Sequence, residues 1–261
     1  RDEYRLNARI FEYPKPVVSF MQGFTMGGGV GIGCHGTHRI VGESSQIAMP
    51  ETGIGLIPDV GGSLMLALAP GRLGEYLGCS AGRMKAADAI YAGFADLYIP
   101  EANWPALIQA LEEGGNPDLL RDAAEAAPGG TLEAMQADID RCFAGEGLGD
   151  ILTVLKGDGS EFAAKALKAL KRNSPLAMAS FVELLHRLRV ESLSIRKALE
   201  HEYRFTFRAM EHGDFLEGIR AQIIDKDRQP KWHYPDANVP AAAVSRMLMP
   251  LGADALTFEE E

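Results

Sequence analysis

Two carboxylates follow a glycine triplet within the first sixty residues, and this pattern could support chemistry at a carbonyl carbon. Gly27, Gly28 and Gly29 come after an apolar run that reads as a buried strand and before a short apolar segment that could form a helix. Such a turn leaves backbone N–H groups free to contact a negatively charged oxygen. Glu51 and Asp59 follow in the chain and can supply a base or a nucleophile. Together these residues predict a site for acyl transfer or for the stabilisation of an enolate.

The apolar neighbours of Glu51 predict a partly desolvated carboxylate. Residues 47–49 before it and residues 54–57 after it are almost all apolar. Burial raises the pKa of a carboxyl group and makes it a better base near neutral pH. Asp59 follows eight positions later and can face the same cavity across the intervening loop. The alternatives are a solvated loop carboxylate or helix cap for Glu51, and an N-cap of the following helix for Asp59.

Other candidate sites have weaker patterns. His35 and His38 are three residues apart, but no third ligand of suitable spacing lies nearby, so the sequence predicts no metal site. Cys34 lies in an apolar, glycine-rich segment, which is typical of a packed thiol. No Gly-x-Ser-x-Gly elbow is present for a serine nucleophile, and no Gly-Lys-Ser/Thr follows the triplet as in a phosphate loop. The triplet alone could also serve only the close packing of a helix on a sheet.

Composition and charge limit the possible partners. The chain has 261 residues, 46% of them hydrophobic, and a formal net charge of −10. This charge disfavours nucleic acid or a membrane as the partner, although it does not exclude a phosphorylated small molecule. Three scattered cysteines indicate free thiols in a reducing compartment. With no apolar run of about 18 residues and no signal-peptide pattern, the sequence predicts a soluble protein of a bacterial cytoplasm or a mitochondrial matrix.

The order of predicted elements indicates an α/β fold with a helical C-terminal half. Short strands are expected at 17–21, 38–41, 46–49 and 94–99, with helices at 1–13, 63–69 and 86–92. We place the α/β core at residues 1–100 and a helical region at residues 101–261, with a loose boundary between them.

Helical patterns dominate the second half. Helix is expected almost without interruption from Ser160, a possible N-cap, to Met210, with one break at 173–175. Asp214 and Glu217 form a possible capping pair for a last helix at 215–224. The tail beyond Pro230 carries few helix or strand signals.

Several segments resemble the crotonase (enoyl-CoA hydratase/isomerase) superfamily and, within it, the branch of the 3-hydroxyisobutyryl-CoA hydrolases. The resemblance lies in residues 15–18, 26–31, 48–51 and 54–62 and, later, in residues 201–204, 215–221 and 224–232. It covers nearly the whole chain apart from a divergent stretch around residues 101–150. The resemblance implies a core of the ClpP/crotonase type, built of short strands and helices. It also implies an enzyme, and members of the family commonly form homo-oligomers.

The resemblance also implies roles for individual residues. Gly28, the middle glycine, would give one N–H of the oxyanion hole that holds the thioester oxygen. Glu51 would be the catalytic carboxylate, and Asp59 would assist it. Glu3, which precedes Tyr4 as in the family, would contact the hydroxyl group of the substrate. These four residues are therefore the predicted catalytic and substrate-binding positions.

The implied reaction is the hydrolysis of a 3-hydroxyacyl-CoA thioester. The expected substrate is 3-hydroxyisobutyryl-CoA, an intermediate of valine degradation, and the products are 3-hydroxyisobutyrate and CoA. Coenzyme A enters as part of the substrate, without a separate cofactor or metal, and Lys226, with Arg228 beside it, is the candidate for contacting its phosphates. Gly31 stands where hydratases carry a second catalytic glutamate, which favours hydrolysis. Enoyl-CoA hydration or isomerisation, and acyl-CoA binding without catalysis, are the alternatives.

Members of this family begin further upstream than this sequence. An upstream strand and loop donate the second N–H of the oxyanion hole and line the path of CoA. The resemblance therefore leads us to expect that the N-terminal part of the fold is missing from these 261 residues.

Overall fold

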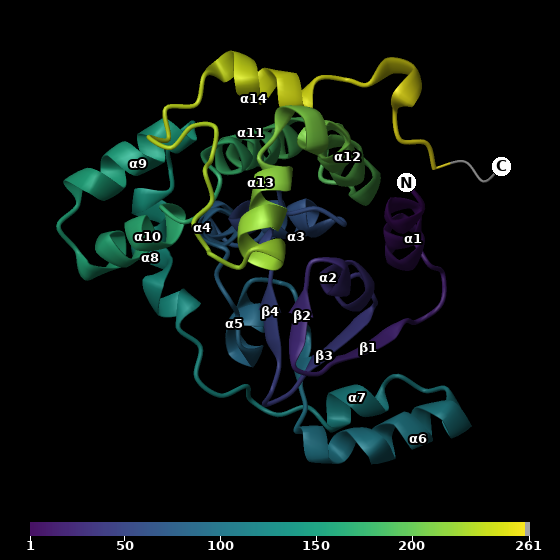
Figure 1. Cartoon of the computed structure of the whole chain (residues 1–261). Coiled ribbons are helices and arrows are strands. Elements are labelled where there is room, and N and C mark those ends of the chain that lie inside the picture. Colours follow the sequence, from purple (N-terminus) through teal and green to yellow (C-terminus); the bar gives the residue numbers. More distant parts are fainter. Residues whose placement is uncertain (259–261) are drawn as a thin grey trace.

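The computed structural model describes residues 1–258 and contains two small parallel sheets within them (Figure 1). The first sheet has the order β1–β3–β5, formed by Val18–Met21, His38–Val41 and Leu97–Tyr98. The second pairs β2, Phe24–Met26, with β4, Gln46–Ala48. Parallel strands need crossover connections, and helices provide several of them here.

Helices surround the strands and make up most of the second half of the chain. α11, α12 and α14 lie together on one side of the strands, and α6 and α7 lie on the opposite side (Figure 1). The helices of the described residues are α1 (Asp2–Phe11), α2 (Gly28–Gly33), α3 (Gly62–Leu68), α4 (Leu73–Ser80), α5 (Ala86–Tyr91), α6 (Trp104–Gly114), α7 (Leu119–Asp122), α8 (Leu132–Cys142), α9 (Leu148–Gly157), α10 (Glu161–Leu170), α11 (Pro175–Glu191), α12 (Ile195–His212), α13 (Phe215–Ile219) and α14 (Ala241–Leu248). Within residues 1–258, none of these helices has both the length and the apolar character that a membrane crossing requires.

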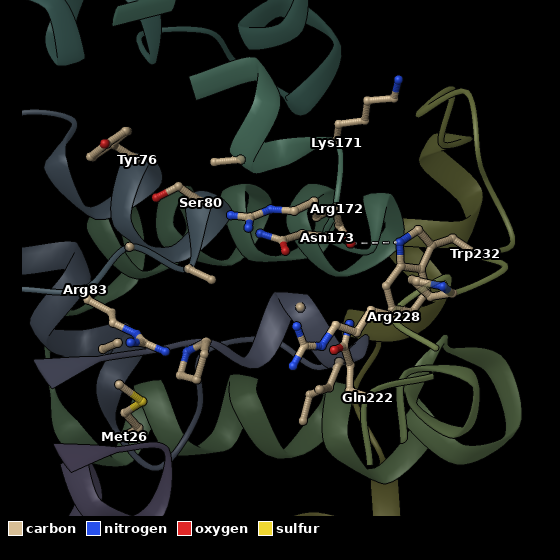
Figure 2. A pocket seen from close by; sticks show the side chains of 18 of the residues that line it. Met26, Tyr76, Ser80, Arg83, Lys171, Arg172, Asn173, Gln222, Arg228 and Trp232 are labelled. Carbon is tan, nitrogen blue, oxygen red and sulfur yellow. Dashed lines mark hydrogen bonds between the residues drawn. The ribbon is translucent and has the colours of Figure 1, made fainter. Parts of the chain in front are cut away.

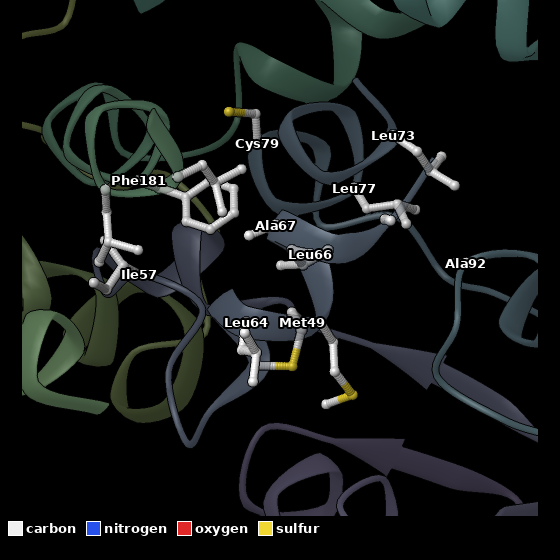
Figure 3. Close-up of a cluster of buried hydrophobic side chains, with 14 of the residues drawn as sticks. Met49, Ile57, Leu64, Leu66, Ala67, Leu73, Leu77, Cys79, Ala92 and Phe181 are labelled. Carbon is white, nitrogen blue, oxygen red and sulfur yellow. The ribbon is translucent and has the colours of Figure 1, made fainter. Parts of the chain in front are cut away.

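The main apolar core lies between α3, α4 and α11 (Figure 3). Leu64 and Leu66 of α3, Leu77 of α4 and Phe181 of α11 are all almost fully buried. A Cβ at Gly78 would lie 2.1 Å from a ring carbon of Phe181, so only glycine lets α4 and α11 approach this closely. This packing holds the helical half of the chain against the loop that follows β4.

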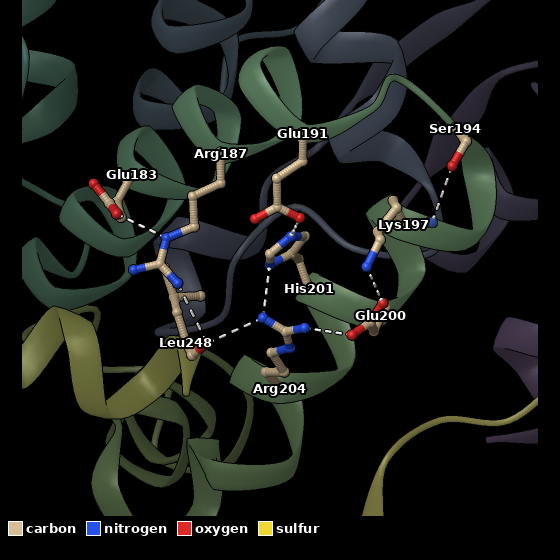
Figure 4. A network of polar contacts seen from close by, with 9 residues as sticks. All are labelled: Glu183, Arg187, Glu191, Ser194, Lys197, Glu200, His201, Arg204 and Leu248. Atoms are coloured by element: carbon tan, nitrogen blue, oxygen red, sulfur yellow. Dashed lines mark hydrogen bonds and ion pairs between the residues drawn. The ribbon is translucent and has the colours of Figure 1, made fainter. Parts of the chain in front are cut away.

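A polar network joins α12 to its neighbours α11 and α14 (Figure 4). His201 Nε2 lies 3.1 Å from the carboxylate of Glu191, and Arg204 donates to His201 Nδ1 at 3.3 Å. Arg187 and Arg204 both donate to the carbonyl of Leu248, at 3.4 and 3.5 Å. These contacts fix the position of α12, which reaches the candidate site described below.

Most of the predicted elements of the first hundred residues are confirmed. The first helix and the strands at 38–41 and 46–49 are present within one or two residues of their expected bounds. The possible helix at the glycines is also present, as α2, and begins at the second glycine of the triplet. The strand expected at 94–99 is only the two-residue β5. β2 and α4 were not predicted, because β2 is three residues long and α4 contains glycine and serine, which weaken a helical pattern.

Three predictions for the second half need correction. The helical run from Ser160 breaks twice, since a second break separates α11 from α12. Asp214 does not cap α13 with its side chain; its carboxylate accepts hydrogen bonds from Ser174 Oγ at 2.6 Å and from the main-chain N–H of His233 at 2.9 Å. The helix expected at 215–224 is confirmed over that range, as α13 followed by a π-helical turn at Arg220–Ile224. The tail holds α14, whose short apolar pattern the sequence analysis missed. The predicted cap at Ser160 is confirmed.

Glu75 of α4 predicts an acid-sensitive contribution to stability. Its carboxylate is fully buried and pairs with Arg189 at 2.5 Å and Arg72 at 2.8 Å. Burial alone would raise the pKa of Glu75, but His186 and the two arginines outweigh it and lower the pKa from 4.5 to about 2. Because the folded-state pKa is depressed, this stabilisation is present above pH 4.5 and is lost as the pH falls toward 2.

We therefore expect Glu75→Gln to lower the free energy of unfolding by about 3 kcal/mol at pH 7, because it breaks a buried ion pair. Urea unfolding at a series of pH values measures the difference from the wild type, which should shrink between pH 4.5 and pH 2. A difference that stays constant over this range would contradict the assignment.

Candidate active site

Strands β2 and β4 bring the glycine turn and Glu51 to the same edge of their sheet. They pair in parallel, with Met26 opposite Ala48, so the chain leaves both strands on the same side. Gly27 follows β2 with a φ of 53°, a conformation that favours glycine. Glu51 begins a 3₁₀ turn just after β4, and its Oε1 lies 3.2 Å from the position that a Cβ at Gly27 would occupy. The expected meeting of the turn and the acid is therefore present.

Gly28 and Glu3 lie at the open side of this turn. Gly28 is exposed and begins α2, so its N–H has no acceptor inside that helix. Glu3 projects from α1, and its Oε1 lies 3.1 Å from the position of a Cβ at Gly28. The structure thus places two carboxylates on the glycine turn, one exposed and one buried. A negatively charged oxygen held by the N–H of Gly28 would have both groups within reach.

Glu51 is a buried carboxylate with an unsatisfied oxygen. Its exposed fraction is 5%, and its Oε2 has no hydrogen-bond partner within residues 1–258. Burial raises the pKa of Glu51 well above its ordinary value, and the charge of Asp59 raises it further. A fold keeps such a group at a cost in stability, which makes Glu51 a candidate for a functional position. The alternative of a solvated loop carboxylate is wrong.

Asp59 is held by Tyr4, a residue to which the sequence analysis gave no role. The hydroxyl of Tyr4 donates to Asp59 Oδ2 at 2.7 Å, and Tyr4 itself is buried. Burial raises the pKa of Asp59 to about 6, although the hydrogen bond from Tyr4 opposes this shift. Asp59 is not the N-cap of α3, because that position belongs to Gly61. The carboxylate is therefore available for chemistry.

A fourth carboxylate, Glu202 of α12, contacts the residues that follow Asp59 in the chain. It is fully buried and accepts hydrogen bonds from the N–H groups of Gly61 at 2.8 Å and Ser63 at 3.1 Å, and from Ser63 Oγ. Burial raises the pKa of Glu202 to about 8, and the charge of Asp59 acts in the same direction. Glu202 lies about 140 positions from this loop, so no local spacing could have indicated the contact.

A large cavity opens beside Glu51 and is surrounded by positive charge (Figure 2). Its volume is about 1280 Å³, and Pro50 and Gly53 on either side of Glu51 line it. The cationic residues among its lining are Arg83, Lys171, Arg172, Arg228 and Lys231, while none of the lining residues described is acidic. In a chain with a net charge of −10, this concentration of cations favours an anionic ligand.

Lys226 and Arg228 differ in their position relative to this cavity. Arg228 lines it, whereas Lys226 is exposed and is not among the described residues that line it. The contact of Lys226 with the phosphates of CoA stays a prediction.

The other candidates of the sequence have packing roles. Cys34 is buried, its sulfur lies 3.4 Å from that of Met21, and burial raises the pKa of its thiol to about 12. His35 Nε2 contacts the carbonyl of Val60 at 2.7 Å, and burial lowers the pKa of this imidazole. His38 Nδ1 contacts Thr37 Oγ1 instead, so the two histidines face different partners.

The sequence profile of the Enoyl-CoA hydratase/isomerase family matches residues 1–248 of the chain. Curated relatives include the mitochondrial 3-hydroxyisobutyryl-CoA hydrolases of Rattus norvegicus, 36% identical over 253 residues, and Homo sapiens, 35% identical over 247 residues. Each alignment covers 90% of this chain and 64% of the relative. The chain therefore spans slightly less than two thirds of the length of these relatives.

Two solved structures superpose on nearly the whole of this chain. An enoyl-CoA hydratase from Rhodobacter sphaeroides 2.4.1 is 56% identical and superposes with a TM-score of 0.91, over 98% of this chain and 74% of that one. A carnitinyl-CoA dehydratase from Mycobacterium thermoresistibile is 39% identical, also with a TM-score of 0.91, over 100% of this chain and 75% of that one. The expected fold of short strands and helices with a helical C-terminal region is confirmed.

Proposed function

Because the chain belongs to the enoyl-CoA hydratase/isomerase (crotonase) family of enzymes, we propose that it hydrolyses an acyl-CoA thioester, with 3-hydroxyisobutyryl-CoA as its substrate. The observation that carries the proposal is the meeting of Glu51 with the Gly27–Gly28 turn, with Asp59 on the loop that follows. The names of the curated relatives support this choice of reaction and substrate.

The N–H of Gly28 would stabilise the oxyanion that forms when the thioester carbonyl is attacked. Glu51 would either attack the carbonyl carbon or activate a water molecule to do so. In the first route the C–S bond breaks, CoA leaves as a thiolate that takes up a proton, and water then hydrolyses the acyl-Glu51 anhydride. In both routes Asp59 would orient the water, and Glu3 would bind the substrate hydroxyl. The acid and free CoA are the products.

The surroundings of Gly31 support hydrolysis over hydration. A hydratase would carry its second catalytic glutamate at this position. A Cβ at Gly31 would lie 2.6 Å from Asn7 Nδ2 and 2.8 Å from Val60 Cβ, and Asn7 also donates to the carbonyl of Gly31 at 3.0 Å. No side chain fits there without a shift of α1 or of the Asp59 loop. The second glutamate that a two-glutamate hydration of a double bond requires therefore cannot be accommodated at position 31.

The cationic cavity supports a CoA thioester as the ligand. Coenzyme A carries several phosphate charges, and Arg228, Lys231 and Arg172 line the cavity next to the loop of Glu51. We propose these residues, with Lys226 as a further candidate, as its phosphate contacts. Enoyl-CoA hydration is the second candidate function, because the structure that is 56% identical is described as an enoyl-CoA hydratase.

Two substrates separate the candidates. The natural gene product that contains this chain is incubated with 3-hydroxyisobutyryl-CoA or with crotonyl-CoA, while free thiol and the enoyl absorbance are both followed. Thiol release from the first substrate, without loss of enoyl absorbance from the second, is the expected result. Loss of enoyl absorbance without thiol release would support the hydratase. Binding of both thioesters without turnover would indicate a non-catalytic acyl-CoA-binding protein.

The pH dependence of this reaction should respond to Tyr4. Both acids are needed in ionised form, so kcat/KM should rise with pH, with a midpoint at or above about 6, the raised pKa of Asp59. Since the Tyr4 hydroxyl lowers the pKa of Asp59, Tyr4→Phe should move this midpoint to higher pH. Tyr91→Phe removes a hydroxyl of α5 that donates to Gln136 of α8 rather than to a carboxylate of the site, and it should leave the profile in place. An unchanged or lower midpoint in Tyr4→Phe would contradict the assignment.

A further inference from the structure

Glu202 takes no part in the proposed reaction, yet the hydrogen bonds described for its carboxylate go to the loop that carries Asp59. Its Oε2 accepts from the N–H of Gly61, and its Oε1 accepts from the N–H and the hydroxyl of Ser63. Three donors therefore converge on one fully buried carboxylate. Through these hydrogen bonds, Glu202 joins α12 to the start of α3.

The loop held in this way has an unfavourable backbone conformation. Val60 has a φ of 53° and Gly61 a φ of 82°. Left-handed geometry is rare for a β-branched residue, and it persists only where the surroundings hold it. His35 contacts the carbonyl of Val60 at 2.7 Å, and Glu202 holds the next N–H. Without these partners the loop would be expected to relax toward an unstrained conformation.

The same helix supports Asp59 from its other side. The ring of Tyr4, whose hydroxyl holds Asp59, packs edge to face on Tyr203 with a centroid distance of 6.0 Å. Tyr203 is the residue after Glu202 on α12, so the acid is fixed through its side chain and through the main chain that follows it. The polar network of His201 and Arg204 in turn fixes α12 itself (Figure 4).

We infer that Glu202 is a positioning residue, which holds the strained turn at Val60–Gly61 so that the carboxylate of Asp59 stays directed at the reacting carbonyl beside Glu51. This inference rests on the proposed function. The rival explanation is a purely structural one, in which Glu202 only joins α12 to α3. Glu75 provides the comparison, because it is an equally buried carboxylate that joins α4 to α11 at a different place in the core.

Three variants test the inference in the natural gene product that contains this chain. Glu202→Gln should lower kcat for thiol release by about 10- to 100-fold and change KM by less than about 3-fold, since a small displacement of a catalytic group costs rate rather than binding. Ser63→Ala removes only one of the three donors and should cause a smaller fall in kcat. Glu75→Gln should lower the thermal midpoint and leave kcat unchanged. A fall in kcat in Glu75→Gln that matches Glu202→Gln would support the structural explanation and overturn ours.

A double-mutant cycle shows whether Glu202 acts through Asp59. In an Asp59→Asn background, Glu202→Gln should have almost no further effect on kcat. Equal effects in both backgrounds would overturn the inference.

Hydrogen exchange supplies a readout that does not need turnover. Peptides covering residues 59–63 should exchange faster in Glu202→Gln than in the wild type, but not in Glu75→Gln. Unchanged exchange would overturn the positioning role. A wild-type protein that releases no thiol would instead overturn the proposed function, and the exchange of residues 59–63 would still decide whether Glu202 holds the loop.

Discussion

Glu51→Gln is expected to reduce thiol release from 3-hydroxyisobutyryl-CoA by about 10³-fold or more. Glutamine keeps the size of the side chain but can neither attack the carbonyl nor accept a proton from water. The Oε2 of Glu51 has no hydrogen-bond partner among residues 1–258, and its Oε1 lies beside the Gly27 turn, so this carboxylate is free to act there. The loss should appear in kcat, with KM little changed, because the interaction is made mainly in the transition state. Steady-state assays of free thiol measure it.

The same variant should be at least as stable as the wild type. The folded-state pKa of Glu51 is raised, so at neutral pH its ionised form destabilises the fold, and a neutral amide removes this cost. Glu112→Gln, on the exposed face of α6, is the matched control and should change neither activity nor the thermal midpoint. Near-full thioesterase activity in Glu51→Gln would remove the proposed mechanism.

Asp59→Asn is expected to lower kcat by about 10²-fold, since an asparagine holds water but cannot carry the charge that directs it. The amide can still accept the hydrogen bond from Tyr4, so the loop should keep its place. The ionisation of Asp59 should no longer contribute to the rise of kcat/KM near pH 6, whereas the ionisation of Glu51 should still contribute to the pH profile. Stopped assays between pH 5 and about 9 measure both effects.

Asp122→Asn, at the exposed end of α7, is the control for this change of charge. It should reproduce the wild-type rate at every pH. If Asp59→Asn kept both the wild-type rate and the wild-type profile, Asp59 would be only a structural partner of Tyr4, and Glu51 would act alone.

The parts of the site that lie close together in the sequence could be predicted. The strand before Glu51 was recognised, whereas the strand before the glycine turn, β2, was not. The motif and the family resemblance, rather than strand pairing, assigned the turn and Glu51 to one site. Asp59 was also identified, because it lies on the loop directly after Glu51. The left-handed backbone at Val60 was not predicted, since valine gives no local signal for that conformation.

The parts that depend on distant contacts could not be predicted. Tyr4 and Glu202 meet the loop only when helices at both ends of the chain pack together, and no pattern in a window of ten or twenty residues encodes such a meeting. Asp214 shows the opposite error. Its spacing from Glu217 matched a helix cap, but the folded chain offers its carboxylate stronger partners in Ser174 and His233.

The packing of α1 on α12 also has a consequence for biosynthesis. Tyr4 reaches Asp59 and lies against Tyr203 and Thr206, so the acid loop is supported by segments made some two hundred residues apart. A ribosome that adds about 5–20 residues per second needs roughly 10–40 s to cover this interval. Before α12 leaves the exit tunnel, the nascent chain contains the glycine turn and the acid loop but not the helix that supports them. The acid loop thus gains its support late in translation, well after the parallel strands are complete.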